Sequence, residues 1–243
     1  MSVASDPDSW LCVDVPLTDY REALALQHGL VAAKNRHRAL QDIVLLLEHS
    51  PVFTLGRRGG LNNLTVDRPF LDKSGISIVQ TERGGDITYH GPGQLIAYPI
   101  IDLKRSGLKV VEYVTALETV MIDIAREFGI IATRNPLNRG IWIEGQKLGS
   151  IGITVRKGIC FHGFALNVDL SLKPFGWINP CGLSGVGVTS LAAVGARAVT
   201  MQKVRQSARF HLAAVFGVEM IGTGMEDLLK MPAFSSLPRL SNA

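Results

Sequence analysis

The stretch that decides the fold lies at positions 140–169 and reads GIWIEGQKLGSIGITVRKGICFHGFALNVD. Residues 140–143, 148–155 and 159–169 are apolar and rich in strand-forming side chains. Short polar turns with glycine separate them, and strands joined by such turns pair in antiparallel fashion. The stretch therefore predicts a three-stranded antiparallel meander.

The segments on either side of this meander add strands and helices. Apolar residues before it recur at the spacing of one helical face and end at Gly129, which predicts a long amphipathic helix. That apolar stripe consists of Val110, Val114, Leu117, Met121, Ile124 and Phe128. Further strands are predicted at residues 10–15, 43–49, 52–55, 76–81 and 95–102, and further helices after the capping residues Asp19 and Thr200. This order predicts an α+β fold, a mixed and largely antiparallel sheet with helices packed on it. We expect one domain over residues 1–230 and a loose tail over residues 231–243.

Composition narrows the class of protein. Of the 243 residues, 47% are hydrophobic and 19% charged, which allows a sizeable core. The apolar runs are far shorter than a membrane span, and the N-terminus lacks a signal pattern, so we expect a soluble cytoplasmic protein. Three cysteines at irregular spacing argue against a disulfide framework and fit a reducing compartment. Cys160 and His162 lack a second ligand pair, so no metal is expected.

The net charge of +4 suggests either nucleic acid or an acidic protein as partner. The basic residues are dispersed and are not interleaved with aromatic residues, and no familiar nucleic-acid module is present. These features argue against nucleic acid as the partner.

The most unusual composition lies at positions 83–94, RGGDITYHGPGQ. Glycines let a backbone approach a ligand closely, while polar side chains fix the ligand's orientation. We expect a binding loop, in which His90 is either an acid/base or, more simply, a residue that shapes the loop. The expected binding residues are Arg83, Gly84, Gly85, Asp86, Ile87, Thr88, Tyr89 and His90. The loop at residues 56–60 is a weak anion-binding candidate, because it lacks the phosphate-loop spacing.

Cys181 lies between Pro180 and Gly182, at a turn that could present a thiol in a cleft. A cysteine attacks as its thiolate, and a lysine ammonium nearby lowers the thiol pKa. Lys147, at the foot of the second meander strand, is the candidate partner. The plain alternative is a buried free cysteine and a surface lysine.

Several of these segments together resemble one family, the lipoate-biosynthesis octanoyltransferases, also called lipoyl(octanoyl) transferases. The similar segments are RGG at 83–85, TYHGPGQ at 88–94, KLGSIG at 147–152, FHGFALNV at 161–168 and NPCG at 179–182. The resemblance covers roughly residues 43–191, most of the chain.

The resemblance implies a biotin/lipoate protein ligase-like catalytic fold and transfer of an octanoyl or lipoyl group. The donor would be octanoyl-acyl carrier protein, and the acceptors lysines of lipoyl domains of 2-oxoacid dehydrogenase complexes or of the glycine-cleavage H protein. It implies Cys181 as the nucleophile that holds an acyl thioester, Lys147 as its acid/base partner, and no cofactor. The substrate pocket would be lined by residues 83–90 together with Ser150, Ile151, Gly152, Gly163, Phe164 and Ala165.

Three other functions stay open at this point. An ATP-dependent lipoate or biotin ligase of the same fold would need no cysteine nucleophile. A non-catalytic binding module could retain the pocket. A cysteine hydrolase could pair Cys181 with His90 or His162 and use water as the acceptor.

Overall fold

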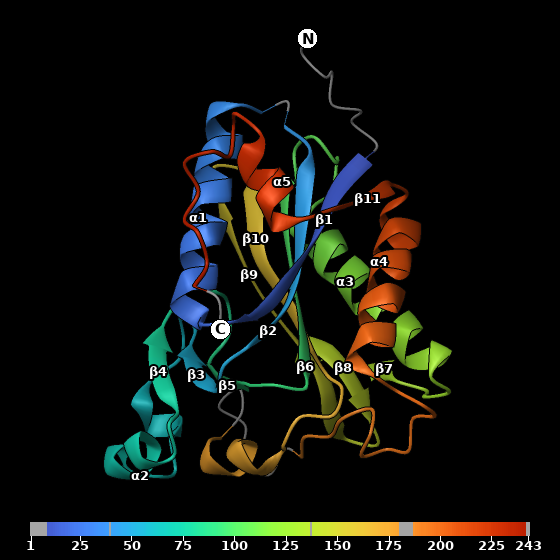
Figure 1. Cartoon of the computed structure of the whole chain (residues 1–243). Helices are drawn as coiled ribbons and strands as arrows, with labels where there is room; N and C mark the ends of the chain where they lie inside the picture. Colours follow the sequence, from blue (N-terminus) through green and yellow to red (C-terminus); the bar gives the residue numbers. More distant parts are fainter. Residues whose placement is uncertain (1–8, 39, 137, 180–186, 242–243) are drawn as a thin grey trace.

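The large sheet is the framework of the molecule (Figure 1). The structure is a computed structural model, and it describes residues 9–38, 40–136, 138–179 and 187–241. Among these residues the large sheet has eight strands in the order β11-β1-β2-β6-β10-β9-β8-β7. They are β1 (Ser9–Thr18), β2 (Asp42–His49), β6 (Gln94–Asp102), β7 (Thr133–Arg134), β8 (Gly140–Ile143), β9 (Gln146–Arg156), β10 (Ile159–Asn167) and β11 (Glu219–Thr223). Strand β1 runs parallel to β2 and β11, and the other neighbours are antiparallel. The predicted α+β fold with a mixed, largely antiparallel sheet is confirmed.

A second, small sheet has the order β4-β3-β5. It consists of β3 (Val52–Leu55), β4 (Ser77–Gln80) and β5 (Ile87–His90), and it has its own core beside the short helices η1 (Leu61–Asn63), α2 (Arg68–Lys73) and η2 (Lys173–Trp177). Strands β3 and β4 were expected from the sequence. Strand β5 falls within the stretch that we expected to be a loop, and the second sheet was not expected.

Helices cover both faces of the large sheet. One face packs against α3 (Val110–Glu127) and α4 (Met201–Phe216), which lie together at one side of Figure 1. The other face packs against α1 (Tyr20–Arg36) and α5 (Met225–Lys230). The predicted caps are present, because the Asp19 carboxylate accepts from the first turn of α1 and the Thr200 hydroxyl accepts from Lys203 N. Within the described ranges, no helix combines the length and apolar character needed to span a membrane.

The C-terminal segment differs from the loose tail that we expected. It runs alongside α1 (Figure 1), with Phe234 2% and Leu237 7% exposed in the core on that side of the sheet. Ser241 hydrogen-bonds the Glu22 carboxylate of α1. These two apolar side chains, spaced about one turn apart, anchor the segment to the core. The prolines and serines around them had led us to predict a loose tail.

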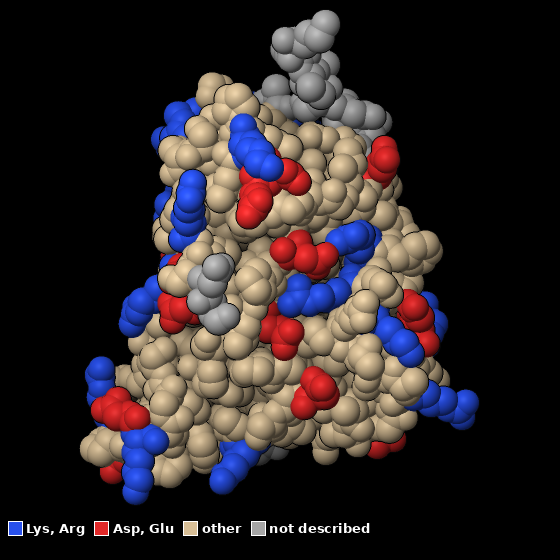
Figure 2. Space-filling model, in the orientation of Figure 1, with Lys and Arg blue, Asp and Glu red and all other residues tan. Residues whose placement is uncertain are grey.

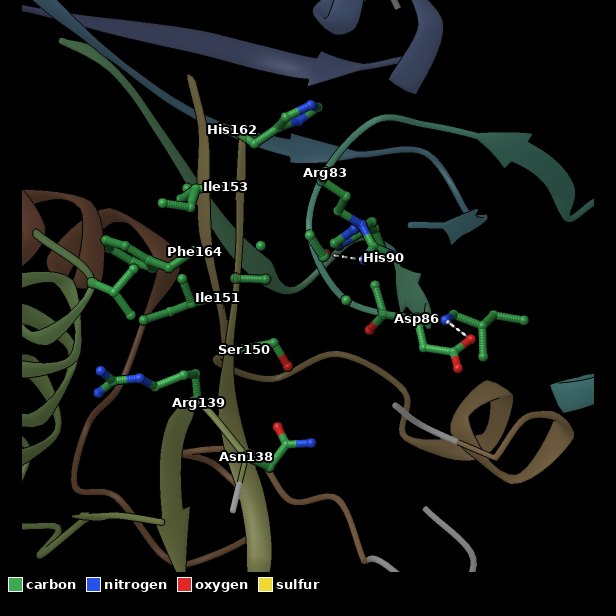
Figure 3. A pocket seen from close by; sticks show the side chains of 18 of the residues that line it. Arg83, Asp86, His90, Asn138, Arg139, Ser150, Ile151, Ile153, His162 and Phe164 are labelled. Carbon is green, nitrogen blue, oxygen red and sulfur yellow. Dashed lines mark hydrogen bonds between the residues drawn. The ribbon is translucent and has the colours of Figure 1, made fainter. Parts of the chain in front are cut away.

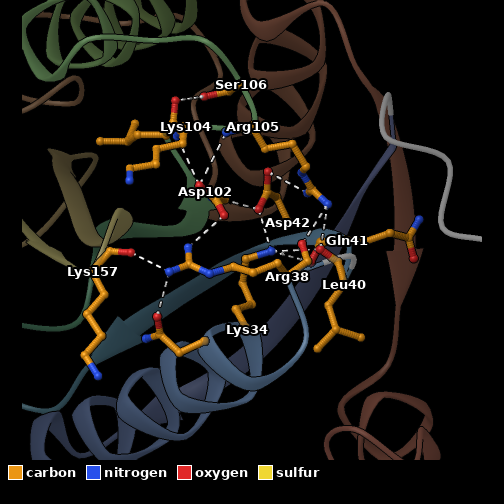
Figure 4. A network of polar contacts seen from close by, with 12 residues as sticks. Lys34, Arg38, Leu40, Gln41, Asp42, Asp102, Lys104, Arg105, Ser106 and Lys157 are labelled. Carbon is orange, nitrogen blue, oxygen red and sulfur yellow. Dashed lines mark hydrogen bonds and ion pairs between the residues drawn. The ribbon is translucent and has the colours of Figure 1, made fainter.

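A buried ion pair joins α1 to the start of β2 (Figure 4). Lys34 Nζ lies 2.6 Å from Asp42 Oδ1, and the two side chains are 0% and 3% exposed. Arg105 adds a second contact to Asp42 at 3.0 Å, and Arg38 pairs with Asp102 at 2.8 Å. Burial lowers the pKa of Lys34, and Asp42 opposes that shift. These charges hold the ends of the helix and of two strands together, remote from the cavity described next.

Candidate active site

A cavity of about 380 Å³ lies between the small sheet's loops and strands β9 and β10 (Figure 3). Figure 3 shows Arg83, Asp86 and His90 on one side and the strand residues Ser150 and Ile151 on the other. The expected binding residues that line it are residues 83–88, His90, residues 150–152 and residues 163–165, and Lys147 lines it too. Tyr89 is not among the lining residues. Its ring packs instead against Phe53 and Phe175, at centroid distances of 5.4 and 5.6 Å, because successive strand side chains point to opposite faces.

The glycine loop is fixed at both ends by hydrogen bonds. Gly84 N donates to Ile153 O of β9 at 2.9 Å, and Arg57 N donates to Arg83 O at 2.9 Å. The Arg83 guanidinium, 8% exposed, donates to the Thr54 carbonyl at 2.6 Å and to the Thr54 hydroxyl at 2.8 Å. The loop therefore ties the small sheet to the large one. The residue 56–60 loop, a weak anion candidate from sequence, forms part of this contact, and its Arg57 and Arg58 line the cavity.

A hydrogen-bond chain runs from His90 to the strand end of β10. His90 Nδ1–H donates to Gln94 Oε1 at 2.7 Å, Gln94 Nε2 donates to Asn167 Oδ1 at 2.8 Å, and Asn167 Nδ2 donates to Thr189 O at 2.8 Å. Burial lowers the pKa of His90 well below its ordinary value, so the ring is neutral. These contacts are those of a residue that shapes the loop. Asp86 is engaged in a similar way, with its carboxylate accepting from Ile87 N and from Asn63 Nδ2.

Lys147 lies beside Asn138, at the end of the cavity away from His162 (Figure 3). It is 4% exposed, its Nζ donates to Asn138 Oδ1, and it lies 5.1 Å from the centroid of the Trp142 ring. Trp142 Nε1 in turn donates to the Asn138 carbonyl at 3.1 Å. These two contacts fix the position of the Lys147 amino group at the cavity.

Cys181 lies outside the described residues. The chain on either side of it is described. Asn179 N donates to Asn63 O at 2.8 Å before it, and Lys147 N donates to Gly187 O at 2.8 Å after it. Thr189 N also donates to Lys147 O at 3.0 Å. The segment that follows Cys181 thus pairs with the backbone of Lys147.

Some lining residues were not found from the sequence. Asn138 and Arg139 come from the turn before β8, and Glu118 of α3 holds that turn through Gly140 N at 2.9 Å and Arg139 Nη1 at 3.0 Å. His162 was considered only for a metal or a hydrolase. Asn138 and Arg139 directly precede β8, the strand that pairs with β9, and this position in the sequence was the signal that could have indicated them. Across the described part of the chain, no cluster of three His, Cys, Asp or Glu side chains is arranged to hold a metal ion.

Comparison with known proteins decides the family. The sequence model of the lipoyl protein ligase A/B catalytic domain matches residues 19–213. The chain belongs to this family. It is 45% identical over 207 residues to the octanoyltransferase of Desulfotalea psychrophila, covering 84% of this chain and 93% of that protein. It is 45% identical over 194 residues to the octanoyltransferase of Geobacter metallireducens, covering 80% and 87%.

Solved structures share the fold at lower identity. Lipoate-protein ligase A bound with ATP superposes with a TM-score of 0.75 at 16% identity, over 94% of this chain and 91% of that one. A putative lipoate protein ligase from T. acidophilum gives 0.73 at 16% identity, over 94% and 92%. The expected biotin/lipoate protein ligase-like fold is confirmed.

Proposed function

We propose that this chain is an acyltransferase that moves an octanoyl or lipoyl group from acyl carrier protein to a lysine of a lipoyl domain or of the glycine-cleavage H protein. The observation that carries the proposal is the cavity itself, which family-like glycine segments line and at one end of which Lys147 is fixed. Relatives at 45% identity that bear the name octanoyltransferase support the same reaction. We assign the activity to residues 1–230 as one domain, with the C-terminal segment packed against it, acting in the cytoplasm.

Cys181 is the proposed nucleophile. Its thiolate attacks the donor thioester carbonyl, the enzyme thioester forms, and the carrier's thiolate leaves. This exchange is nearly balanced in energy, so it needs no ATP or other cofactor. The acceptor lysine amine then attacks the enzyme thioester, and the more stable amide forms as Cys181 is released. Covalent catalysis divides the transfer in two, so the two protein substrates need not bind together.

Lys147 is the proposed acid/base partner. It would take the thiol proton of Cys181, give a proton to the departing carrier thiolate, and later accept a proton from the acceptor amine. The backbone pairing of Lys147 with Gly187 supports this assignment, because it brings the segment after Cys181 to the lysine. Backbone N–H groups near Cys181 or in the glycine loop are candidates for the oxyanion site.

Basic residues at the cavity suit acidic carrier and lipoyl domains. Arg57, Arg58 and Arg139 line it together with Lys147, and the chain's net charge is +4. On the face shown in Figure 2, lysines and arginines are scattered among acidic residues rather than gathered in one patch. We expect the association rate to fall steeply as salt increases, and a rate independent of salt would contradict electrostatic steering.

The deciding experiment is intact-protein mass spectrometry after mixing the enzyme with octanoyl-acyl carrier protein in the absence of ATP. We expect a mass gain of one octanoyl group that hydroxylamine removes, that Cys181→Ser lacks, and that passes to a lipoyl-domain lysine. No adduct, with transfer only when ATP and free acid are supplied, would instead establish the ligase reaction. Adduct loss to water, with no acceptor modified, would establish the hydrolase. The absence of any reaction would indicate a binding module.

A further inference from the structure

His162 has an unusual backbone in the middle of β10. Its φ is 57°, in the left-handed region that non-glycine residues seldom occupy. This conformation turns the ring to the side of its neighbour Phe161, with ring centroids 4.9 Å apart, and edge-on to Tyr98 at 6.0 Å. The backbone N–H of His162 donates to Gln27 Oε1 of α1 at 2.8 Å, which fixes the distortion. The backbone therefore holds the ring at a fixed position in the cavity wall, which a regular strand conformation would not give it.

The ring of His162 is buried without hydrogen bonds. It lines the cavity with 1% of the residue exposed, and neither Nδ1 nor Nε2 has a partner among the described residues. Burial lowers the pKa to about 3, so the ring is neutral and offers one donor and one acceptor. Buried polar groups are nearly always hydrogen-bonded. A polar atom inside the cavity is what this ring requires.

The ring lies far from Lys147 along the cavity. His162 pairs with Ile153, six residues along β9 from Lys147, which is about 20 Å at the rise of a strand. Between them the two strands contribute the apolar side chains of Ile151, Phe164 and Ala165 beside the hydroxyl of Ser150, and the facing pair Gly152 and Gly163 adds no side chain. Figure 3 shows the same order, with Asn138 at one end and His162 at the other. A hydrocarbon held at the Lys147 end would thus extend toward a polar terminus.

We propose that His162 determines acyl-chain specificity by requiring a polar partner at the distal end of the cavity. This rests on the proposed function, because it concerns the acyl group of that reaction. An acyl chain that ends before it reaches the His162 ring leaves space in which water can hydrogen-bond the ring nitrogens. A plain hydrocarbon long enough to reach the ring leaves both nitrogens unsatisfied. A chain of the same length that ends in a hydroxyl gives one of them a partner.

The test compares acyl donors within each enzyme variant. The donors are octanoyl, dodecanoyl and hexadecanoyl carrier protein and the ω-hydroxy counterpart of each. In the wild type, at the length where transfer first declines, we expect the ω-hydroxy chain to exceed the plain chain in kcat/KM by about ten- to a hundredfold. His162→Leu should reverse this order, because an apolar ring replacement favours the methyl end. His162→Asn, which keeps a donor and an acceptor and tolerates a left-handed backbone, should preserve it.

Each result separates the two proposals. Equal ratios of plain to ω-hydroxy transfer in the wild type and in His162→Leu would overturn the role of His162 while leaving octanoyl transfer intact. Failure of the wild type to transfer any acyl group would overturn the proposed function. In that case, calorimetric binding of hexadecanoic and 16-hydroxyhexadecanoic acids to the same variants gives the same comparison without turnover. His162→Gly, which suits the backbone, replaces the leucine variant if the latter does not fold.

Discussion

Gly152 provides the sharpest test of how the glycine loop and β9 form the cavity. A Cβ atom at this position would lie 3.0 Å from Gly84 O and 3.1 Å from Arg83 Cδ. Ordinary van der Waals contacts begin near 3.4 Å. Gly152→Ala must therefore displace the loop by a few tenths of an ångström, against the Gly84 N to Ile153 O hydrogen bond that holds it.

The expected change in stability is small and the expected change in activity is large. Overpacking costs about 1–3 kcal/mol, and losing a strand glycine returns about 0.5–1 kcal/mol, which leaves a net destabilisation of about 0–2.5 kcal/mol. For a chain of this size that lowers the melting temperature by less than about 10 °C. Because a misplacement of about 1 Å costs about a hundredfold in rate, a shift of a few tenths of an ångström should lower kcat/KM by about tenfold.

The assay pairs thermal unfolding with octanoyl transfer at a temperature where both variants are folded. Gly176→Ala is the matched control, since a Cβ there meets nothing within 4 Å. It should retain both melting temperature and rate. A Gly152→Ala enzyme within twofold of wild-type kcat/KM would refute the view that close contact between the loop and the strand sets the cavity.

Three other outcomes follow from the described contacts. Asn138→Ala removes the acceptor of Lys147 Nζ and should lower kcat about tenfold or more with little change in KM, measured by steady-state transfer; an unchanged kcat would exclude the contact from catalysis. Burial lowers the pKa of His49 to about 4 and that of His162 to about 3, from 6.5, so the unfolded chain takes up protons first as pH falls. The free energy of unfolding from urea titrations should thus have its highest value above pH 6.5 and decline toward pH 4. The decline is at most about 1.4 kcal/mol per pH unit for each histidine, and a flat profile would contradict neutral buried rings. Asp42→Ala leaves a buried lysine unpaired and should cost about 3–5 kcal/mol in the same titrations, whereas a loss below about 1 kcal/mol would show that the pair is not buried in solution.

Local pattern was enough to locate most elements. The stripe from Val110 to Phe128 gives α3, observed over Val110–Glu127, and the meander segments give β8, β9 and β10. Hydrophobic period and capping residues act between neighbours in the chain, so they can be read without knowing the fold. The glycine segments that resemble the family also came from sequence alone, and each of them up to residue 168 contributes residues to one cavity, although Tyr89 does not line it.

Contacts between distant segments decided the rest. Strand β11 is short and half-exposed, and it exists because it pairs with β1 from the opposite end of the chain. The small sheet forms because β3 pairs with β4 and β5 rather than with a strand of the large sheet. Asn138 meets Lys147 across a strand pair, and His162 turns into the cavity because Gln27 of α1 holds its backbone. The sequence by itself determined where the chain becomes helix or strand and which residues resemble a catalytic family, because those signals are local. Only the tertiary structure decided which side chains surround Lys147 and which polar group ends the cavity, because those placements depend on pairing and packing between residues far apart in the chain.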